Sequence, residues 1–338
     1  MKRSVFIIAG VLLFGIFITT HTTSAQSFTP YTIIDAQTEV SVTLNPDYPQ
    51  PNEDFTVNLE SYAVDLNASQ ISFYRNGKLV GSGLGLREYL YIGGNIGEKL
   101  TIKVTITPHN GNSFDKQLVF IPGAVSLDWE AHTYTPPFYK GKALYTDESS
   151  VTFYALADMY DTAGNKIDPT KLIYNWKING KGAADKSGTG RNTLLLSNER
   201  SFSSSITASV TVTSLDKTSV VEQSISIPIK TPKIVVYKKS DLYGIDWNRG
   251  LTDIASSPEN FSLVAVPYYF GAFSATAQNI NYEWTDRNSS TKISYNNEAR
   301  INLSESLEGS LARFNVSVKN ASTVFQKAYK NLIITINE

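Results

Sequence analysis

The sequence predicts an all-β protein in which three tandem β-sandwiches follow an N-terminal signal or anchor segment. The first observation is a strand-like stretch that occurs three times with a large ring at the same place, namely Phe73, Trp176 and Trp284. A period of two with one apolar face is typical of a half-buried strand. The second is their separation, since about a hundred residues is the length of one sandwich domain. The third is composition: 19 Tyr and 16 Phe, many in runs rich in Thr, Ser, Val and Ile, favour strands.

The N-terminus has the organisation of an export signal. Residues 1–3 (MKR) are basic, residues 4–20 are an almost unbroken apolar run, and residues 23–25 (TSA) place small side chains before Gln26. We expect residues 1–25 to be a signal peptide, or a membrane anchor if uncleaved, because about 17 apolar residues can just span a bilayer. Residues 26–38 then form a polar leader. The protein is predicted to be exported to the extracellular space or the cell-envelope surface.

Three units follow the leader, at residues 39–122, 123–231 and 232–338. The first two share landmarks beyond the core ring: an Asn-Gly pair after the ring-bearing strand, a Gly-x-Gly turn, and an alternating strand at nearly the same spacing. Asn-Gly predicts a type I′ hairpin, which needs a positive φ at both central positions. The third unit lacks this pair. The linkers near 122–124 and 229–232 are short and contain Pro, which predicts a semi-rigid rod.

These landmarks resemble those of known bacterial surface domains. The Tyr-x-Trp strand, followed by Asn-Gly and a later Thr/Val strand, resembles bacterial immunoglobulin-like and PKD-like domains, although residues 176–180 (WKING) lack the acidic core of the PKD signature. More narrowly, three segments are similar to uncharacterised exported proteins of small-genome candidate-phyla bacteria: 73–78 (FYRNGK), 127–131 (LDWEA) and 134–144 (YTPPFYKGKAL). The resemblance implies three tandem immunoglobulin-like sandwiches and an exported location. It implies no activity.

Charge and histidine content argue against several function classes. The chain has 30 basic and 31 acidic residues, without the basic footprint of a nucleic-acid binder. No cysteine is present, so the sequence offers neither a disulfide nor a thiolate metal site. Of three histidines, one lies in the signal segment, and His109 and His132 belong to different units, whereas a zinc site needs several convergent ligands. There is also no Gly-x-Ser-x-Gly elbow. We therefore expect no catalysis and no nucleic-acid partner.

One acidic loop has the composition of a calcium site. Asp158, Asp161 and Asp168 lie close together in the second unit, and carboxylates with loop carbonyls are the ligands that calcium prefers. The spacing does not match the EF-hand loop. The alternative is a solvated turn built around Gly164. Calcium is thus the one cofactor that the sequence brings into consideration.

Two aromatic clusters lie outside the core stripe. Tyr134, Phe138 and Tyr139 occupy the second unit, and a similar place in the third unit holds Tyr268, Tyr269 and Phe270. Such rings form stacking platforms for sugars or adhesive patches. Alternatively, they cover the ends of the sandwiches or the joints between them.

Together these observations predict a non-enzymatic cell-surface or envelope protein that acts as a binding, adhesion or spacer module. The alternative is a carbohydrate-binding surface protein that uses the Tyr/Phe clusters. The expected partner is an envelope or extracellular protein, or a glycan. Membrane contact is expected only through residues 4–20, if they stay uncleaved.

Overall fold

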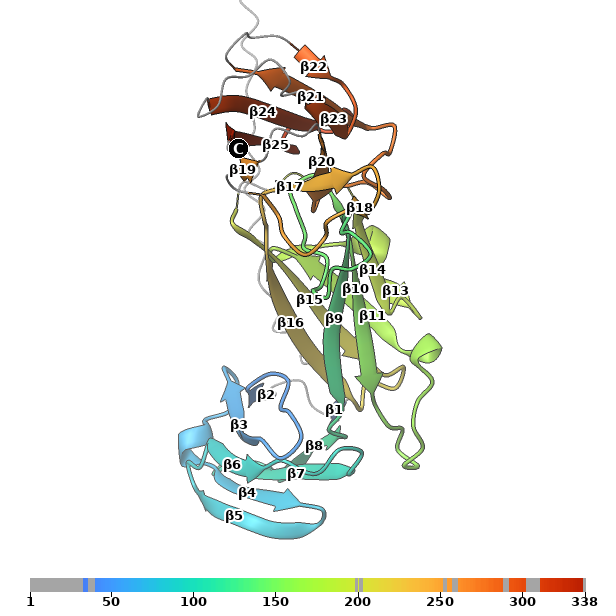
Figure 1. Cartoon of the computed structure of the whole chain (residues 1–338). Helices are drawn as coiled ribbons and strands as arrows, with labels where there is room; N and C mark the ends of the chain where they lie inside the picture. Colours follow the sequence, from blue (N-terminus) through green and yellow to red (C-terminus); the bar gives the residue numbers. More distant parts are fainter. Residues whose placement is uncertain are drawn as a thin grey trace, which may run out of the picture.

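The computed structural model describes residues 33–35, 40–197, 200, 203–251, 254–256, 261–287, 292–301 and 311–336. The expected signal segment 1–25 lies outside these residues, as does the leader 26–38 apart from 33–35. The described chain forms three successive two-sheet sandwiches, stacked from the blue N-terminal sandwich to the red C-terminal one (Figure 1). The fold-class prediction is confirmed: the protein is all-β, with tandem immunoglobulin-like sandwiches. No described helix is both long and apolar enough to cross a membrane.

The first sandwich packs a three-stranded sheet against a five-stranded sheet. The smaller sheet has the order β2 (Val40–Asn45), β3 (Asp54–Ser61) and β6 (Glu88–Ile92). The larger sheet has the order β1 (Ile33–Asp35), β8 (Phe114–Phe120), β7 (Leu100–Thr107), β4 (Gln70–Arg75) and β5 (Lys78–Leu84). Strand β1 falls within the stretch expected to be a leader. A short 3₁₀ turn, η1 (Leu66–Ala68), precedes β4.

The second sandwich repeats this plan. Its smaller sheet has the order β14 (Thr193–Ser197), β10 (Ser150–Asp158) and β9 (Ala124–His132). Its larger sheet has the order β12 (Lys181–Gly182), β11 (Ile173–Ile178), β15 (Ser205–Thr213) and β16 (Val220–Pro228), and β13 (Gly188–Thr189) also pairs with β11. The 3₁₀ turn η2 (Pro169–Lys171) precedes β11, and η3 (Ala184–Lys186) follows β12.

The third sandwich keeps the arrangement and adds short edge strands. One sheet has the order β18 (Gly244–Ile245), β17 (Lys233–Ser240), β20 (Phe261–Tyr268) and β23 (Glu298–Ile301). The other has the order β19 (Ile254–Ser256), β25 (Lys327–Ile336), β24 (Leu311–Asn320), β21 (Ile280–Asp286) and β22 (Lys292–Ser294). Described strands pair antiparallel throughout, except that β19 runs parallel to β25.

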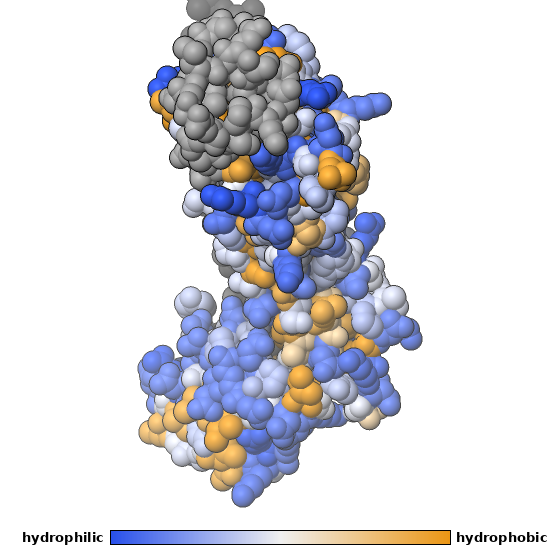
Figure 2. Space-filling model, in the orientation of Figure 1, coloured by the Kyte–Doolittle hydropathy of each residue, from blue (hydrophilic) through white to orange (hydrophobic). Residues whose placement is uncertain are grey.

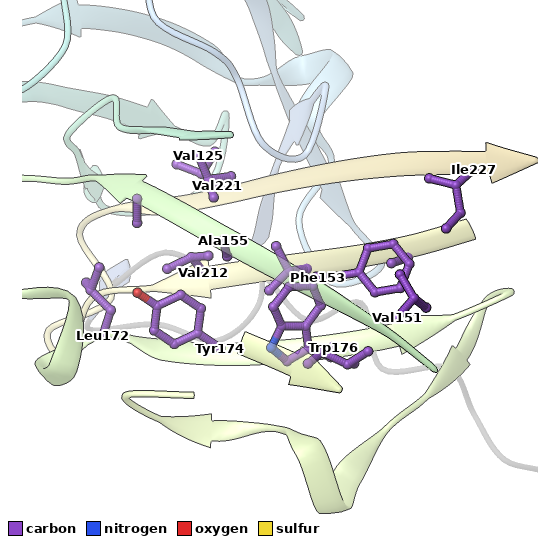
Figure 3. Close-up of a cluster of buried hydrophobic side chains, with 14 of the residues drawn as sticks. Val125, Val151, Phe153, Ala155, Leu172, Tyr174, Trp176, Val212, Val221 and Ile227 are labelled. Carbon is purple, nitrogen blue, oxygen red and sulfur yellow. The ribbon is translucent and has the colours of Figure 1, made fainter. Parts of the chain in front are cut away.

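Each core is centred on the ring of the repeated strand. Phe73, Trp176 and Trp284 are at most 1% exposed and belong to three separate apolar clusters. Each ring-bearing residue sits opposite a valine of the next strand, in the same register in all three units. Figure 3 shows Trp176 between the two sheets of the second sandwich, among side chains from both. The indole Nε1 of Trp176 donates to the Arg191 carbonyl (2.8 Å), which satisfies the polar atom of a buried ring.

The Asn-Gly pairs form the hairpins that the sequence predicts. Asn76 and Gly77 have φ of 49° and 80°, and Asn179 and Gly180 have 49° and 78°. In both hairpins the asparagine also bonds sideways to the neighbouring long strand: Asn76 Oδ1 accepts from the Thr101 amide (2.8 Å), as Asn179 Oδ1 does from the Thr207 amide (2.9 Å). The asparagine side chain therefore ties the hairpin to the rest of its sheet.

The joint between the first and second sandwiches is made by backbone and small residues. Residues 121–123 are buried, and the Ile121 amide donates to the Thr218 carbonyl of the second sandwich (2.8 Å). In return, Val220 of β16 belongs to the apolar cluster of the first sandwich. A Cβ added at Gly123 would lie 3.0 Å from the Met159 side chain, so a larger residue there would require its neighbours to shift. This linker is a packed contact.

Candidate functional site

The two aromatic clusters meet at the joint between the second and third sandwiches. Tyr134 and Tyr269 pair across the joint, because the Tyr134 amide donates to the Phe270 carbonyl and the Tyr269 amide donates to the Tyr134 carbonyl, both at 2.8 Å. The Thr146 hydroxyl donates to the Tyr269 carbonyl (2.8 Å). Residues from the two units are therefore joined by a short backbone bridge of hydrogen bonds.

Phenol side chains continue the contact beside this bridge. The hydroxyls of Tyr139 and Tyr269 lie 2.8 Å apart across the joint, and so do those of Tyr237 and Tyr268 within the third sandwich. The Tyr139 ring also lies edge-on to Tyr268 and Tyr269. Burial, followed by the hydrogen bond with Tyr139, raises the pKa of Tyr269 to about 12, and burial and the Tyr237 hydroxyl raise the pKa of Tyr268. Tyr268 and Tyr269 are therefore neutral hydrogen-bonding groups at neutral pH.

Accessibility divides the six aromatic residues. Tyr268 and Tyr269 are 5% exposed, and Phe270 is fully buried in the core of the third sandwich. Tyr134 and Tyr139 are half-buried, whereas Phe138 is 38% exposed. The structure thus brings five of the six together at the joint and places Phe270 beneath it.

Phe138 belongs to an aromatic group that the sequence did not reveal. Its ring lies 4.5 Å from that of Trp247 and 6.2 Å from that of Tyr237, both in the third sandwich. Trp247 is 39% exposed, so the edge of the joint reaches the surface at Phe138 and Trp247. A tryptophan in a polar loop was the available signal, but its partner is more than a hundred residues away and follows no periodic pattern.

A second group of contacts crosses the same joint with polar side chains. Glu148 Oε2 accepts hydrogen bonds from the amides of Val324 (2.7 Å) and Phe325 (2.8 Å). Gln326, which is 2% exposed, donates to the Asp147 carbonyl (3.0 Å). Glu148 and Tyr269 both have positive φ, 59° and 66°, a region that non-glycine residues seldom occupy. Two residues with uncommon backbone angles therefore lie where the two sandwiches touch.

A polar pocket opens beside these contacts, with a volume of about 320 Å³. The second sandwich contributes His132, Glu148 and Ser150, and the third contributes Phe273, Asn279 and Ser322, among others. His132 Nε2 lies 2.8 Å from the hydroxyl oxygen of Thr152. The sequence alone does not reveal this pocket, because its residues come from strands and turns that are remote along the chain.

The acidic loop of the second sandwich is engaged in local hydrogen bonds. Asp161 Oδ1 accepts from the amides of Ala163 and Asn165 (both 2.9 Å), and Asp158 pairs with Lys166 (2.9 Å). The backbone amide bonds lower the pKa of Asp161. Within the described ranges, acidic and histidine side chains do not gather in threes that could hold a metal ion. Calcium binding here stays a prediction.

Asp168 has a separate structural role. Its carboxylate caps η2 by accepting from the Thr170 amide (2.9 Å), which lowers its pKa. Asp65 caps η1 in the same way in the first sandwich, where it accepts from the Asn67 amide (3.0 Å). Because the cap recurs at the equivalent place in a second unit, turn formation accounts for this residue.

Comparisons with known proteins find matches among solved structures. No protein-family model matches the sequence, and neither does any curated protein. Among solved structures, fibronectin(III)-like modules of Clostridium thermocellum CbhA are 13% identical, with 56% of this chain and 94% of that chain covered and a TM-score of 0.27. The central fibronectin-III array of RIM-binding protein is 13% identical, with 88% and 96% covered and a TM-score of 0.26. Three N-terminal domains of the bacteriophage RB49 outer capsid protein Hoc are 12% identical, with 88% and 98% covered and a TM-score of 0.25. Likenesses of this size say nothing about what the chain binds.

Proposed function

We propose that this chain is a non-enzymatic, exported protein of the cell surface or envelope that binds an extracellular protein or glycan. Its second and third sandwiches act as one rigid body. The observation that carries the proposal is the joint between these sandwiches, where a backbone bridge, a phenol pair and the Glu148 contacts occur together. The first sandwich, packed through residues 121–123, extends this body.

The physical argument for a rigid body is that this joint differs from an ordinary flexible contact between domains. Contacts between domains of one chain are commonly polar and permit relative motion. Here the contact combines buried rings with directional hydrogen bonds. These hydrogen bonds weaken if one sandwich rotates relative to the other. Holding two modules at a fixed angle is useful when a partner touches both, or when a binding surface is carried away from the cell.

Export in this proposal is supported by the basic start and apolar run of residues 1–20 and by the small residues before Gln26. On the face shown in Figure 2, apolar side chains form separate small patches among hydrophilic ones. Scattered apolar residues are normal for a soluble surface. This face therefore fits binding through a few specific contacts better than adhesion through a broad hydrophobic surface.

The carbohydrate-binding alternative needs a different set of residues from the two sequence clusters. The rings of Tyr268 and Tyr269 are almost completely covered, so a sugar cannot stack on them while the joint is closed. Phe138 and Trp247 remain accessible at the joint's edge. A glycan ligand is accordingly proposed for exposed groups around the joint.

The rigid body is tested by distance measurements between spin labels, which the cysteine-free chain accepts without background. Leu195→Cys and Tyr329→Cys place labels on exposed positions of the second and third sandwiches. Leu195→Cys with Leu215→Cys gives a control pair within the second sandwich, also exposed. We expect equally narrow distance distributions for both pairs. A distribution several times broader for the first pair contradicts the proposal.

Export is tested separately, with the full chain expressed in a bacterial host. Mass spectrometry and a membrane-impermeant biotin reagent applied to intact cells report cleavage and exposure. We expect labelling from outside, with a mature chain that starts at Gln26 or an intact anchor at the membrane. A full-length chain found only in the cytosol contradicts this part of the proposal.

A further inference from the structure

We propose that the polar pocket beside the second joint binds one neutral sugar unit of a glycan, with the ring of Phe273 as its stacking surface. The inference rests on the proposed function, since it names the ligand class of a surface binding module. The pocket, about 320 Å³, is at the lower end of the roughly 300–1,000 Å³ typical of ligand sites. That size suits a single ring-sized group better than an extended peptide.

The base of the pocket is a network of hydrogen-bonded amides. Asn320, 3% exposed, donates through Nδ2 to Gln326 Oε1 (2.8 Å) and accepts through Oδ1 from Asn279 Nδ2 (3.1 Å). Gln326 Oε1 also accepts from the Gly271 amide (2.8 Å). Buried polar groups that are fully hydrogen-bonded make a rigid base. This network fixes the loop that begins at Gly271 against β24 and the turn before β25.

Phe273 stands on that fixed loop and is 102% exposed, so it contributes nothing to any core. A single exposed apolar residue is ordinary by itself. Here, however, Phe273 is one of the residues that line a pocket whose other members include hydroxyl, amide and carboxylate groups, together with His132, Gly271 and Ala272. An apolar face next to an array of hydrogen-bonding groups matches a pyranose, which has C–H bonds on its faces and hydroxyls around its edge.

The walls offer free hydrogen-bonding capacity from both sandwiches. Glu148 uses Oε2 for the joint, and its Oε1 has no partner among the described residues. The same holds, within that part of the chain, for the hydroxyls of Ser150 and Ser322 and for Asn279 Oδ1. Acceptors and hydroxyls of this kind bind sugar hydroxyls, which donate and accept. Donors and acceptors from two modules would converge on one ligand.

Charge narrows the ligand to a neutral saccharide. Glu148 is the one carboxylate among the residues that line the pocket. An acidic sugar would place a second negative charge against it, which costs affinity in a partly desolvated site. A neutral sugar meets no such penalty and can donate a hydroxyl to the carboxylate.

The test is isothermal titration of the purified full-length protein with neutral tetrasaccharides of β1,4-linked glucose, α1,4-linked glucose and β1,4-linked N-acetylglucosamine, and with tetragalacturonate as the acidic contrast. We expect at least one neutral tetrasaccharide to bind with a dissociation constant of about 1 mM or tighter, and tetragalacturonate to bind more weakly. Phe273→Ala should weaken binding by about tenfold through loss of stacking. Ser150→Ala should weaken it several-fold from the other sandwich.

Tyr62→Ala is the matched control, because Tyr62 is an equally exposed ring in the first sandwich. It should leave binding unchanged. The inference is overturned if no neutral tetrasaccharide binds, if Phe273→Ala binds as the parent does, or if Tyr62→Ala loses as much. These results are distinguishable from failure of the proposed function, which the spin-label distances and the cell-surface labelling decide without any ligand.

Discussion

Each of the two joints holds two neighbouring sandwiches together, but the contacts that do so differ between them. The first is held by backbone: Ile121 bonds to Thr218, and Gly123 lies against Met159. The second has backbone hydrogen bonds of its own, between Tyr134 and residues 269–270, and adds side chains: the Tyr139–Tyr269 phenol pair and the Glu148 carboxylate. The first joint is crowded around Gly123, whereas the second depends on particular hydrogen bonds. The two should therefore fail under different substitutions.

The largest effect should come from the core that supports both joints. Trp176→Ala empties the centre of the second sandwich, where the ring is 1% exposed. Removal of a buried tryptophan costs about 3–5 kcal/mol in unfolding free energy. Urea denaturation should show this loss, and Leu156→Ala, at an exposed position of β10, should cost little. If the Trp176→Ala variant unfolds at the same urea concentration as the parent, the core of the second sandwich does not support the two joints.

Gly123→Val should damage the first joint specifically. The new Cβ would lie 3.0 Å from Met159 Cγ and 3.1 Å from Ser219 Oγ, and both neighbours are fully buried. Overpacking of this kind costs about 1–3 kcal/mol. Amide spectra should change around residues 121–123 and not at the second joint. Gly182→Val is the control, because nothing lies within 4 Å of a Cβ there; equal losses in both variants would argue against a tight first joint.

The phenol pair of the second joint should contribute less. Tyr139→Phe and Tyr269→Phe each remove one hydroxyl of a hydrogen-bonded pair and leave the other without its partner. A double-mutant cycle on unfolding free energy should give a coupling of about 0.5–1.5 kcal/mol. The spin-label distances between the second and third sandwiches should broaden in both single variants. Zero coupling would mean that the hydrogen bond between the two phenols does not stabilise this joint.

The smallest expected effect is a loss of stability at alkaline pH, when Tyr269 loses its proton; it is absent at neutral pH. Burial and the bond with Tyr139 raise the pKa of Tyr269 from 10.0 to about 12, so the folded state resists loss of this proton. The stabilisation is complete below pH 10 and is lost as pH rises from 10 to about 12. Tyr269→Phe should therefore lose less stability across this window than the parent in thermal melts. Equal losses would show that other phenols govern the alkaline response.

The sequence reveals these two joints to different degrees. Aromatic clusters indicated the second joint, although whether they faced a ligand or a neighbouring sandwich depended on burial that only the fold determines. The first joint left a weaker trace, since Pro122 and Gly123 look like any linker. Repeated strands were predictable because a period of two and a core ring are local patterns. The Phe138–Trp247 contact and the polar pocket were not, because their residues meet only after three units have folded and docked.

The calcium prediction also shows that closeness in sequence does not reveal which side chains act together in the fold. Asp158, Asp161 and Asp168 are neighbours in sequence, which made them look like one set of ligands. In the fold the first forms an ion pair, the second stabilises a turn, and the third caps a 3₁₀ turn. Asp65 could have been compared with Asp168, since both stand six residues before a core position of the repeated strand.

The paired hairpin asparagines have a consequence for the chemical ageing of a long-lived external protein. Asn-Gly is the dipeptide in which the next backbone nitrogen most easily attacks the side-chain amide, because glycine has no Cβ in the way. The cyclic imide that results opens to isoaspartate, in which the main chain runs through the former side chain, or to aspartate, which carries a carboxylate where the amide was. The side chains of Asn76 and Asn179 hold the neighbouring strand through Oδ1, so an aspartate formed there keeps the acceptor that the Thr101 and Thr207 amides need. Simple deamidation would change the net charge of the protein while leaving both hairpins tied.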